Sequence, residues 1–340
     1  MRAVGSAWDG PMDDPLTPLP VGAFLARDVA RAGVDDGALR RAVRAGRLVR
    51  PRTGVYVRAT DWDRAGPEGR HLLLVQAVGR QLEHPVFSHE SAAVLWGLPL
   101  VGEPDAVHVL GPATPTGAHR GTGRRAGLVR HAAPADVPVA SRRGLRTTAP
   151  AETLVSLARA RDALQAVPVV DGALRTGLAT REDLLAALAT CAGSPGSRRA
   201  ALAVALGDGA AESVGESVSR VRIHLDGLEP PALQVPLAEG SSVIARVDFW
   251  WHAARVAGEF DGRKKYRTDG VPDRRAVEER LWAEKRREDR LRSRGVRVVR
   301  WTWTDLWTPG VLASRLLAAG VRPTRSRATH GGGRRLGRNA

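Results

Sequence analysis

The chain has 340 residues, 43% of them hydrophobic, which is enough to build more than one apolar core. No apolar run reaches the length of a membrane span and the N-terminus has no apolar signal core, so we expect a cytoplasmic protein with no membrane partner. The single Cys191 excludes an intramolecular disulfide and a cysteine-rich zinc site. The net charge of +16 favours nucleic acid as a partner, although charge does not separate DNA from RNA.

The N-terminal part has the layout of a winged helix-turn-helix. Residues 1–18, rich in Pro, Gly and Asp, are expected to form a flexible tail. Within 19–60, two helices at Ala23–Ala32 and Gly37–Ala45 precede a hairpin, LVRPRTGVYV. The second helix of such a domain enters the major groove and its wing contacts phosphate. The arginines expected at the DNA are Arg40, Arg41, Arg44, Arg47, Arg50 and Arg52. The alternative is a helical hairpin with a solvated arginine face.

Residues 61–208 are expected to form an α-rich connecting domain. Residues 61–68 have the composition of a linker, one strand is predicted at Ala106–Leu110, and 111–130 is predicted to be a loop or irregular hairpin. The predicted helices are 71–82, 89–96 capped by Ser88, 149–160, 163–175, 181–189 and 197–205. The residues of catalytic type here are Ser88, His89, Glu90, His108 and His131. No nucleophile signature surrounds them, which favours a structural role.

The last domain, 209–320, contains a strand pair with acidic side chains on one face. Side chains alternate along a strand, so Val247, Phe249 and Trp251 face one way and Asp248 the other. On the second strand Glu259 and Asp261 share the face of Asp248. Neighbouring like charges repel on a sheet, and a divalent cation with oxygen ligands would remove that repulsion. The alternative is a solvated acidic face.

The phrase VDFWW…GEFDGRKKY resembles the PD-(D/E)xK nuclease superfamily, nearest to the very-short-patch-repair endonucleases. The resemblance implies a restriction-endonuclease-like mixed sheet flanked by helices, within a multidomain α/β chain. It implies Mg²⁺ or Mn²⁺ held by Asp248, Glu259 and Glu216, with Glu212 as the second choice for the helix acid. The implied catalytic residues are Asp248, Glu259, Asp261 and Lys264, with Lys265 as an alternative to Lys264. Asp261 stands where the family carries lysine, which leaves an inactive site as the alternative.

The segment GVDDGALRRAVRAGRLVRPRTGVYV resembles the N-terminal domain of AbiEi-type antitoxins, which are transcriptional regulators of type IV toxin–antitoxin pairs. The middle region resembles the linking part of AbiEi-like actinobacterial proteins, and 321–340 is expected to be a basic, disordered tail. Two functions follow. One is a DNA-binding, metal-dependent endonuclease that hydrolyses phosphodiester bonds. The other is a regulator or antitoxin with an inactive nuclease-like domain and a cognate toxin as partner. An RNA-processing role is a third, weaker hypothesis.

Overall fold

The computed structural model describes residues 22–31, 33–111, 123–125, 127–134, 136–239, 242–262, 282 and 285–324. The chain divides into two compact units, Met1–Gly209 and Ala210–Ala340. The predicted tail 1–18, most of the tail 321–340, and Lys264 and Lys265 lie outside the described residues. Within the described part, every helix is too short or too polar to cross a bilayer.

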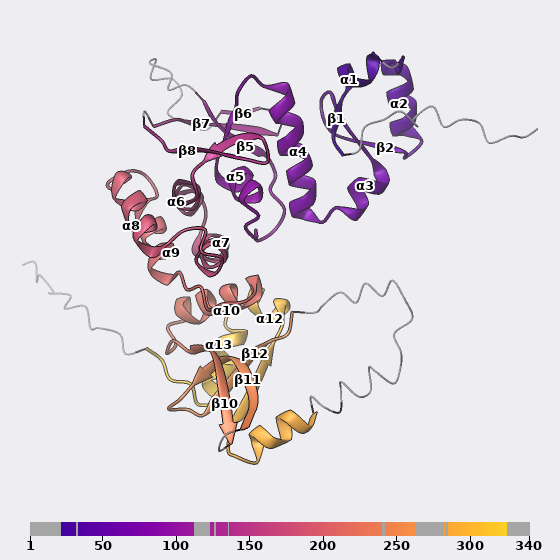
Figure 1. Ribbon diagram of the computed structural model, residues 1–340. Coiled ribbons are helices and arrows are strands. Elements are labelled where there is room, and N and C mark those ends of the chain that lie inside the picture. Colours follow the sequence, from indigo (N-terminus) through magenta and orange to yellow (C-terminus); the bar gives the residue numbers. More distant parts are fainter. Residues whose placement is uncertain are drawn as a thin grey trace, which may run out of the picture. The chain divides into compact units, whose positions relative to one another are not determined.

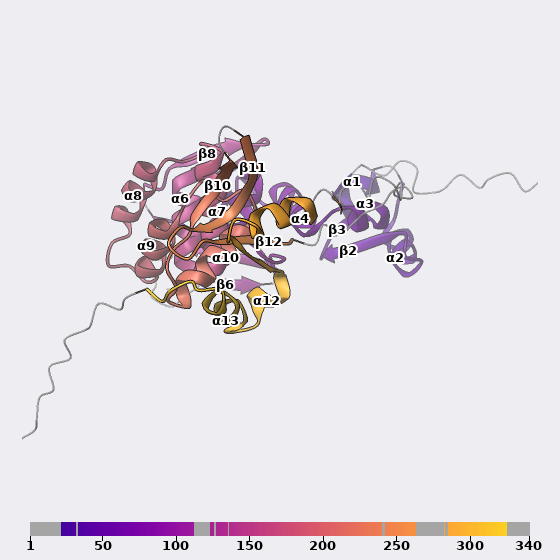
Figure 2. The ribbon, with the colours of Figure 1, turned by 90° about the horizontal axis from the view of Figure 1, so that it is seen from below.

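The first unit begins with a small head of helices and strands, seen together in Figures 1 and 2. Its elements are β1 (Phe24–Leu25), α1 (Ala26–Ala30), α2 (Asp36–Arg44), β2 (Leu48–Arg52) and β3 (Val55–Arg58). The strands form an antiparallel sheet in the order β1-β3-β2. Asp35 caps α2 because its carboxylate accepts the Ala38 N–H at 2.6 Å. The first predicted helix is shorter than expected, since Phe24 and Leu25 pair with β3 instead.

An apolar cluster holds the head to the following helix, α4 (Pro67–Gln81). Leu25, Val55 and Ala77 pack together in the core, and Asp28 forms an ion pair with Arg80 at 2.8 Å. The predicted linker 61–68 is also ordered, because α3 (Ala59–Arg64) and the first residues of α4 occupy most of it. The winged part is therefore built into the first unit rather than tethered to it.

The middle region is not simply α-rich, because it contains a six-stranded mixed sheet in the order β6-β7-β5-β4-β9-β8. Its strands are β4 (Val86–Phe87), β5 (Val107–Gly111), β6 (Gly123–Arg125), β7 (Leu128–Ala132), β8 (Val139–Arg142) and β9 (Leu145–Thr148). The remaining helices are α5 (His89–Trp96), α6 (Pro150–Ala160), α7 (Ala163–Arg175), α8 (Arg181–Thr190) and α9 (Ser197–Leu206). Most of these strands are too short for an alternating pattern to show.

The second unit carries a four-stranded mixed sheet in the order β10-β11-β12-β13. The first three strands are antiparallel, and β13 runs parallel to β12. The elements are α10 (Val214–Leu225), β10 (Ala232–Glu239), β11 (Ser242–Trp251), β12 (Val256–Phe260), β13 (Arg297–Trp301), α12 (Trp303–Trp307) and α13 (Val311–Ala318). Residues 285–292 are helical, and two short helices, α12 and α13, follow β13.

The core of this sheet is aromatic. Phe249 and Trp301 lie with ring centroids 5.1 Å apart, and the Trp301 indole donates to Ser219 Oγ at 2.7 Å. Trp301 passes so close to Gly258 that a Cβ there would lie 2.5 Å from the indole, so glycine is needed. The predicted C-terminal tail begins later than expected. Pro323 bridges Leu228, and Thr324 donates its N–H to the Gly227 carbonyl at 2.7 Å.

Candidate nucleic-acid interface and carboxylate site

The arginines of α2 and the turn after it form an exposed basic face. Leu39 and Ala42 are fully buried against the head, so the residues between them face outward. The predicted arginines that lie exposed are Arg40, Arg41, Arg44, Arg47 and Arg50. These five cations lie on α2, on the turn after it and on β2, and a DNA phosphate backbone would attract their charge.

The two wing arginines differ from each other. Arg50 is exposed, with its guanidinium carbon 5.9 Å from the ring centroid of Tyr56. Arg52 is half-buried and donates from Nε to Gln81 Oε1 on α4 at 3.1 Å. Burial, and then Arg130, lower the pKa of Arg52 from its usual value. Arg52 thus helps to join the wing to α4, while Arg50 keeps its charge in solvent.

Two of the predicted metal ligands, Glu216 and Asp248, are joined through Gln234. The Gln234 amide nitrogen lies 2.8 Å from Glu216 Oε2 and 3.5 Å from Asp248 Oδ1. Glu216 is buried on α10, where Ser213 Oγ and the Glu212 N–H donate to its two oxygens at 2.7 and 2.9 Å. Glu216 therefore faces Gln234 on the sheet and not solvent.

Asp248 lies at the end of the antiparallel pairing between β11 and β12. Its Oδ2 accepts the Phe260 N–H at 3.0 Å. Burial raises the pKa of Asp248, and the nearby Glu216 carboxylate raises it further, while the Phe260 hydrogen bond opposes the shift. Asp248 and Glu216 therefore repel each other in a partly buried setting, whereas the alternating pattern predicted repulsion between Asp248 and the strand acids Glu259 and Asp261. A cation between Asp248 and Glu216 would relieve this repulsion.

The remaining predicted residues share a cavity of about 210 Å³ with Asp248. Glu259 and Asp261 both line it, together with Arg246, Arg287 and Arg300. Glu259 is held by Arg287 at 2.7 Å and by Arg300 at 3.2 Å, so arginines already offset its charge. Asp261 is exposed, and its N–H donates to the Trp301 carbonyl at 2.8 Å.

Two other predicted residues do not join this group. Glu212, the second choice for the helix acid, pairs instead with Arg246 at 2.7 Å on the exposed side. Lys264, the predicted catalytic lysine, lies outside the described residues.

A third group of polar residues assembles in the first unit. His89 begins α5, His108 lies on β5 and His131 on β7, and one nitrogen from each ring lies within 4.8 Å of the others. Ser88 is the N-cap residue of α5, but its hydroxyl contacts the ring of His89 at 3.0 Å rather than a helix N–H. The sequence named all of these residues and favoured a structural role for each, because nothing local connects them.

Two segments of the chain match known protein families. Residues 21–59 match the family described as the AbiEi antitoxin transcriptional regulator, and residues 86–207 match the AbiEi antitoxin C-terminal domain. Both matches are to AbiEi antitoxin domains. The first AbiEi segment contains the head with α2 and its wing, and the second contains the six-stranded sheet and the imidazoles. Neither family match extends into the second unit, which contains the carboxylates.

Similar curated proteins include the uncharacterized proteins MT2308 and Rv2248 of Mycobacterium tuberculosis, from strains CDC 1551 / Oshkosh and ATCC 25618 / H37Rv. Each is 36% identical over 118 residues, which cover 35% of this chain and 44% of the relative. The chain therefore spans less than half the length of these relatives. The crystal structure of the RV2827C protein from Mycobacterium tuberculosis aligns with a TM-score of 0.33 and 22% identity, over 55% of this chain and 72% of that one. This likeness supports no conclusion about fold or function.

Proposed function

We propose that the protein is a DNA-binding transcriptional regulator of the AbiEi antitoxin type. The observation that carries the proposal is the pair of AbiEi matches, 21–59 and 86–207, in chain order. The exposed arginine face of α2 supports it, because this helix is the one that a winged helix-turn-helix inserts into the major groove. A cognate toxin is the partner that this proposal implies.

Within this proposal the arginines have different tasks. Arg40 and Arg44 stand one turn apart on α2 and reach base edges or the flanking phosphates. Arg50 contacts phosphate from the wing. Arg52 contributes less to DNA binding, because its guanidinium is committed to Gln81 and its charge is partly buried.

The test is a binding titration of the full chain on the DNA upstream of its own gene, repeated over a range of salt concentrations. Arg40→Ala and Arg44→Ala should each cost about 1–3 kcal/mol where a base is contacted, or lower the salt slope by about 0.9 per lost phosphate contact. Arg198→Ala removes an equally exposed arginine from α9 and should change neither quantity. Equal losses in all three variants, or no binding to that DNA, would refute the proposal.

A second candidate function concerns the carboxylates of the second unit. The pair Glu216 and Asp248, linked by Gln234 and partly buried, favours binding of Mg²⁺ or Mn²⁺. A bound ion would activate water for attack on a phosphodiester. Against catalysis, Glu259 is neutralised by Arg287 and Arg300, and Asp261 occupies the position of the family lysine. Cation binding without cleavage is therefore the form of this proposal that the geometry supports best.

A cleavage assay decides between nuclease activity and regulation without cleavage. Supercoiled, linear and single-stranded DNA are incubated with the protein, with or without Mn²⁺, and wild type is compared with Asp248→Ala and Glu259→Ala. Nicking that needs the metal and is lost in both variants would establish a nuclease. Salt-sensitive DNA binding that is equal in all three proteins, without cleavage, supports the regulator.

A further inference from the structure

The three histidines of the first unit come from segments that the sheet brings together. β5 and β7 are parallel neighbours, with Leu110 paired to His131, so His108 and His131 point to the same face two positions apart. The nitrogens His108 Nδ1 and His131 Nε2 are 2.8 Å apart. The ring of His89 stacks on that of His131 with centroids 3.8 Å apart.

The nitrogens that face away from the cluster lie near oxygen atoms, at hydrogen-bond distance for His89 and at ion-pair distance for His108. His89 Nδ1 lies 3.0 Å from Ser88 Oγ, and His108 Nε2 lies 3.5 Å from Glu90 Oε2. A histidine that binds a metal through one nitrogen almost always donates its other N–H to a carboxylate, a carbonyl or water. This arrangement leaves Nε2 of His89 and Nδ1 of His108 for the centre of the cluster. Nε2 of His131 faces Nδ1 of His108.

The backbone and the surroundings also favour a ligand role. His89 has φ +52°, a left-handed conformation that is uncommon for a bulky side chain and that concentrates at functional sites. Burial, and then the neighbouring imidazoles, lower the pKa of His89 well below its usual value. The pKa of His131 is lowered in the same way, to about 4. His89 and His131 are therefore held in the neutral form, which is the form of imidazole that coordinates a metal.

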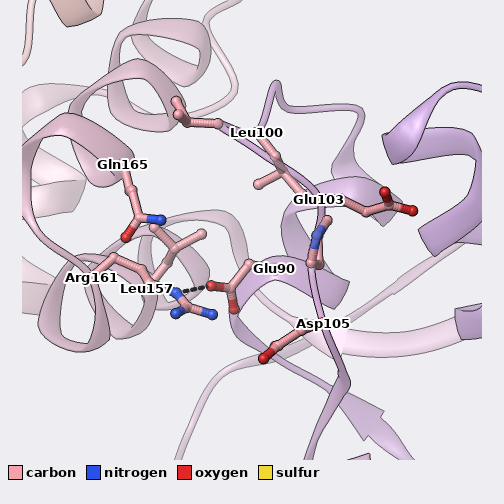
Figure 3. Close-up of a pocket in the computed structure, with 9 residues that line it drawn as sticks. Glu90, Leu100, Glu103, Asp105, Leu157, Arg161 and Gln165 are labelled. Atoms are coloured by element: carbon pink, nitrogen blue, oxygen red, sulfur yellow. Dashed lines mark hydrogen bonds and ion pairs between the residues drawn. The ribbon is translucent and has the colours of Figure 1, made fainter. Parts of the chain in front are cut away.

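We propose that His89, His108 and His131 bind a first-row divalent transition metal ion, of which Zn²⁺ is the first choice because imidazole nitrogen suits it. Three protein ligands leave one position of a tetrahedral ion for water. Glu90 borders both His108 and a cavity of about 240 Å³, in which it pairs with Arg161 (Figure 3). Asp105 and Gln165 also line this cavity, so a cavity with polar walls lies one side chain away from the imidazoles.

Metal binding requires one ring to move. A metal lies in the plane of each imidazole that it contacts, whereas His89 and His131 stack with only 17° between their planes. His131 is the partly exposed member of the cluster, while His89 and His108 are buried. We therefore assign the movement to His131, whose ring turns off the stack to direct Nε2 at the ion.

The experiment is a Co²⁺ titration of the full chain after chelator treatment, followed by visible absorption and then by displacement with Zn²⁺. Wild type should bind one ion with the intense absorption of a four-coordinate nitrogen site, and bound Zn²⁺ should raise the melting temperature. His131→Gln should weaken binding by at least about 100-fold, and Glu90→Gln by about 10–100-fold. His224→Gln removes an exposed histidine from α10 and should bind like wild type.

Each result decides the proposal. Loss of the intense band in His131→Gln but not in His224→Gln supports it. Equal binding by wild type and His131→Gln would overturn it, as would equal losses in both histidine variants or no intense band at all. Weak absorption that disappears in Asp248→Ala would report the carboxylates of the second unit, so failure here leaves that separate proposal standing.

Discussion

The two clusters of ionisable side chains reduce the cost of burial in opposite ways. The imidazole cluster of His89, His108 and His131 avoids charge, because burial depresses the pKa values of His89 and His131. The carboxylate cluster of Glu216, Asp248 and Glu259 instead brings acidic groups close together. Two arginines pair with Glu259 and offset its negative charge. Protonation therefore destabilises the imidazole cluster, and a hard cation would reduce the repulsion within the carboxylate cluster.

The clusters also differ in how the chain assembles them. Asp248 and Glu259 come from adjacent strands of one hairpin, and Glu216 lies on α10, which β10 separates from that hairpin in the sequence. The imidazoles come from a helix start and two parallel strands that are not neighbours in sequence. Local spacing can therefore reveal the carboxylate cluster but not the imidazole cluster.

Acidification should have the largest effect, and it should act through the histidines of the first unit. Burial, and then His108, lower the pKa of His71 to about 4 from 6.5, while Glu90 and Asp105 oppose the shift. Between these values the unfolded chain binds the proton and the folded chain does not. The contribution of neutral His71 to the free energy of unfolding is therefore fully present above about pH 6.5, and it is lost as the pH falls toward about 4. We expect a loss on the order of 3 kcal/mol from His71.

Urea unfolding of metal-free protein between pH 4 and 7.5 measures the slope of the free energy of unfolding against pH. His71→Gln should flatten it, while the exposed His224→Gln should leave it unchanged. A slope that is the same in wild type and His71→Gln would mean that this imidazole is not kept neutral by its surroundings.

Gly215→Ala should separate the carboxylates of Glu216 and Asp248 and leave the imidazole cluster unchanged. A Cβ at Gly215 would lie 1.8 Å from Phe260, whose ring packs edge-on against Trp303. Overpacking of this kind costs about 1–3 kcal/mol and would push α10, with Glu216, away from Asp248. Thermal unfolding and metal titration measure both effects. Gly66→Ala, where an added Cβ meets nothing within 4 Å, is the control: it should leave the metal titration unchanged, and thermal unfolding should report only the exchange of glycine for alanine at the N-cap of α4.

Asp248→Asn should give the smallest effect, and its sign is informative. The raised pKa means that ionised Asp248 costs stability above that pKa, so the cost is present at neutral pH and declines on acidification. Asparagine removes the charge and can still accept the Phe260 N–H, although its amide nitrogen then faces the Gln234 amide nitrogen, which keeps its hydrogen bond to Glu216. We expect a gain of at most about 1 kcal/mol at pH 7, because the site is partly solvated.

Mn²⁺ provides the second measurement on this variant. It should stabilise wild type and not Asp248→Asn, as judged by melting temperature. Asp289→Asn, an exposed change in the same unit, should respond like wild type. Destabilisation of Asp248→Asn in metal-free protein at pH 7 would contradict the repulsion between Asp248 and Glu216.

The sequence by itself determined the features that depend on neighbouring residues. The approximate bounds of helices α2 and α8, the strand pair β11 and β12, and the common acidic face of Asp248 and Glu259 follow from helical and strand periodicity. These patterns are local, because a residue's face is set by its position in its own element.

Only the tertiary structure decided the rest. It paired β4 with β9 and β5 with β7, turned Glu216 toward the sheet, and attached Arg287 and Arg300 to Glu259. It also gathered three histidines that the sequence identified separately and did not connect. The physical reason is that parallel pairing and helix packing join residues far apart in the chain, so no spacing within a segment records them.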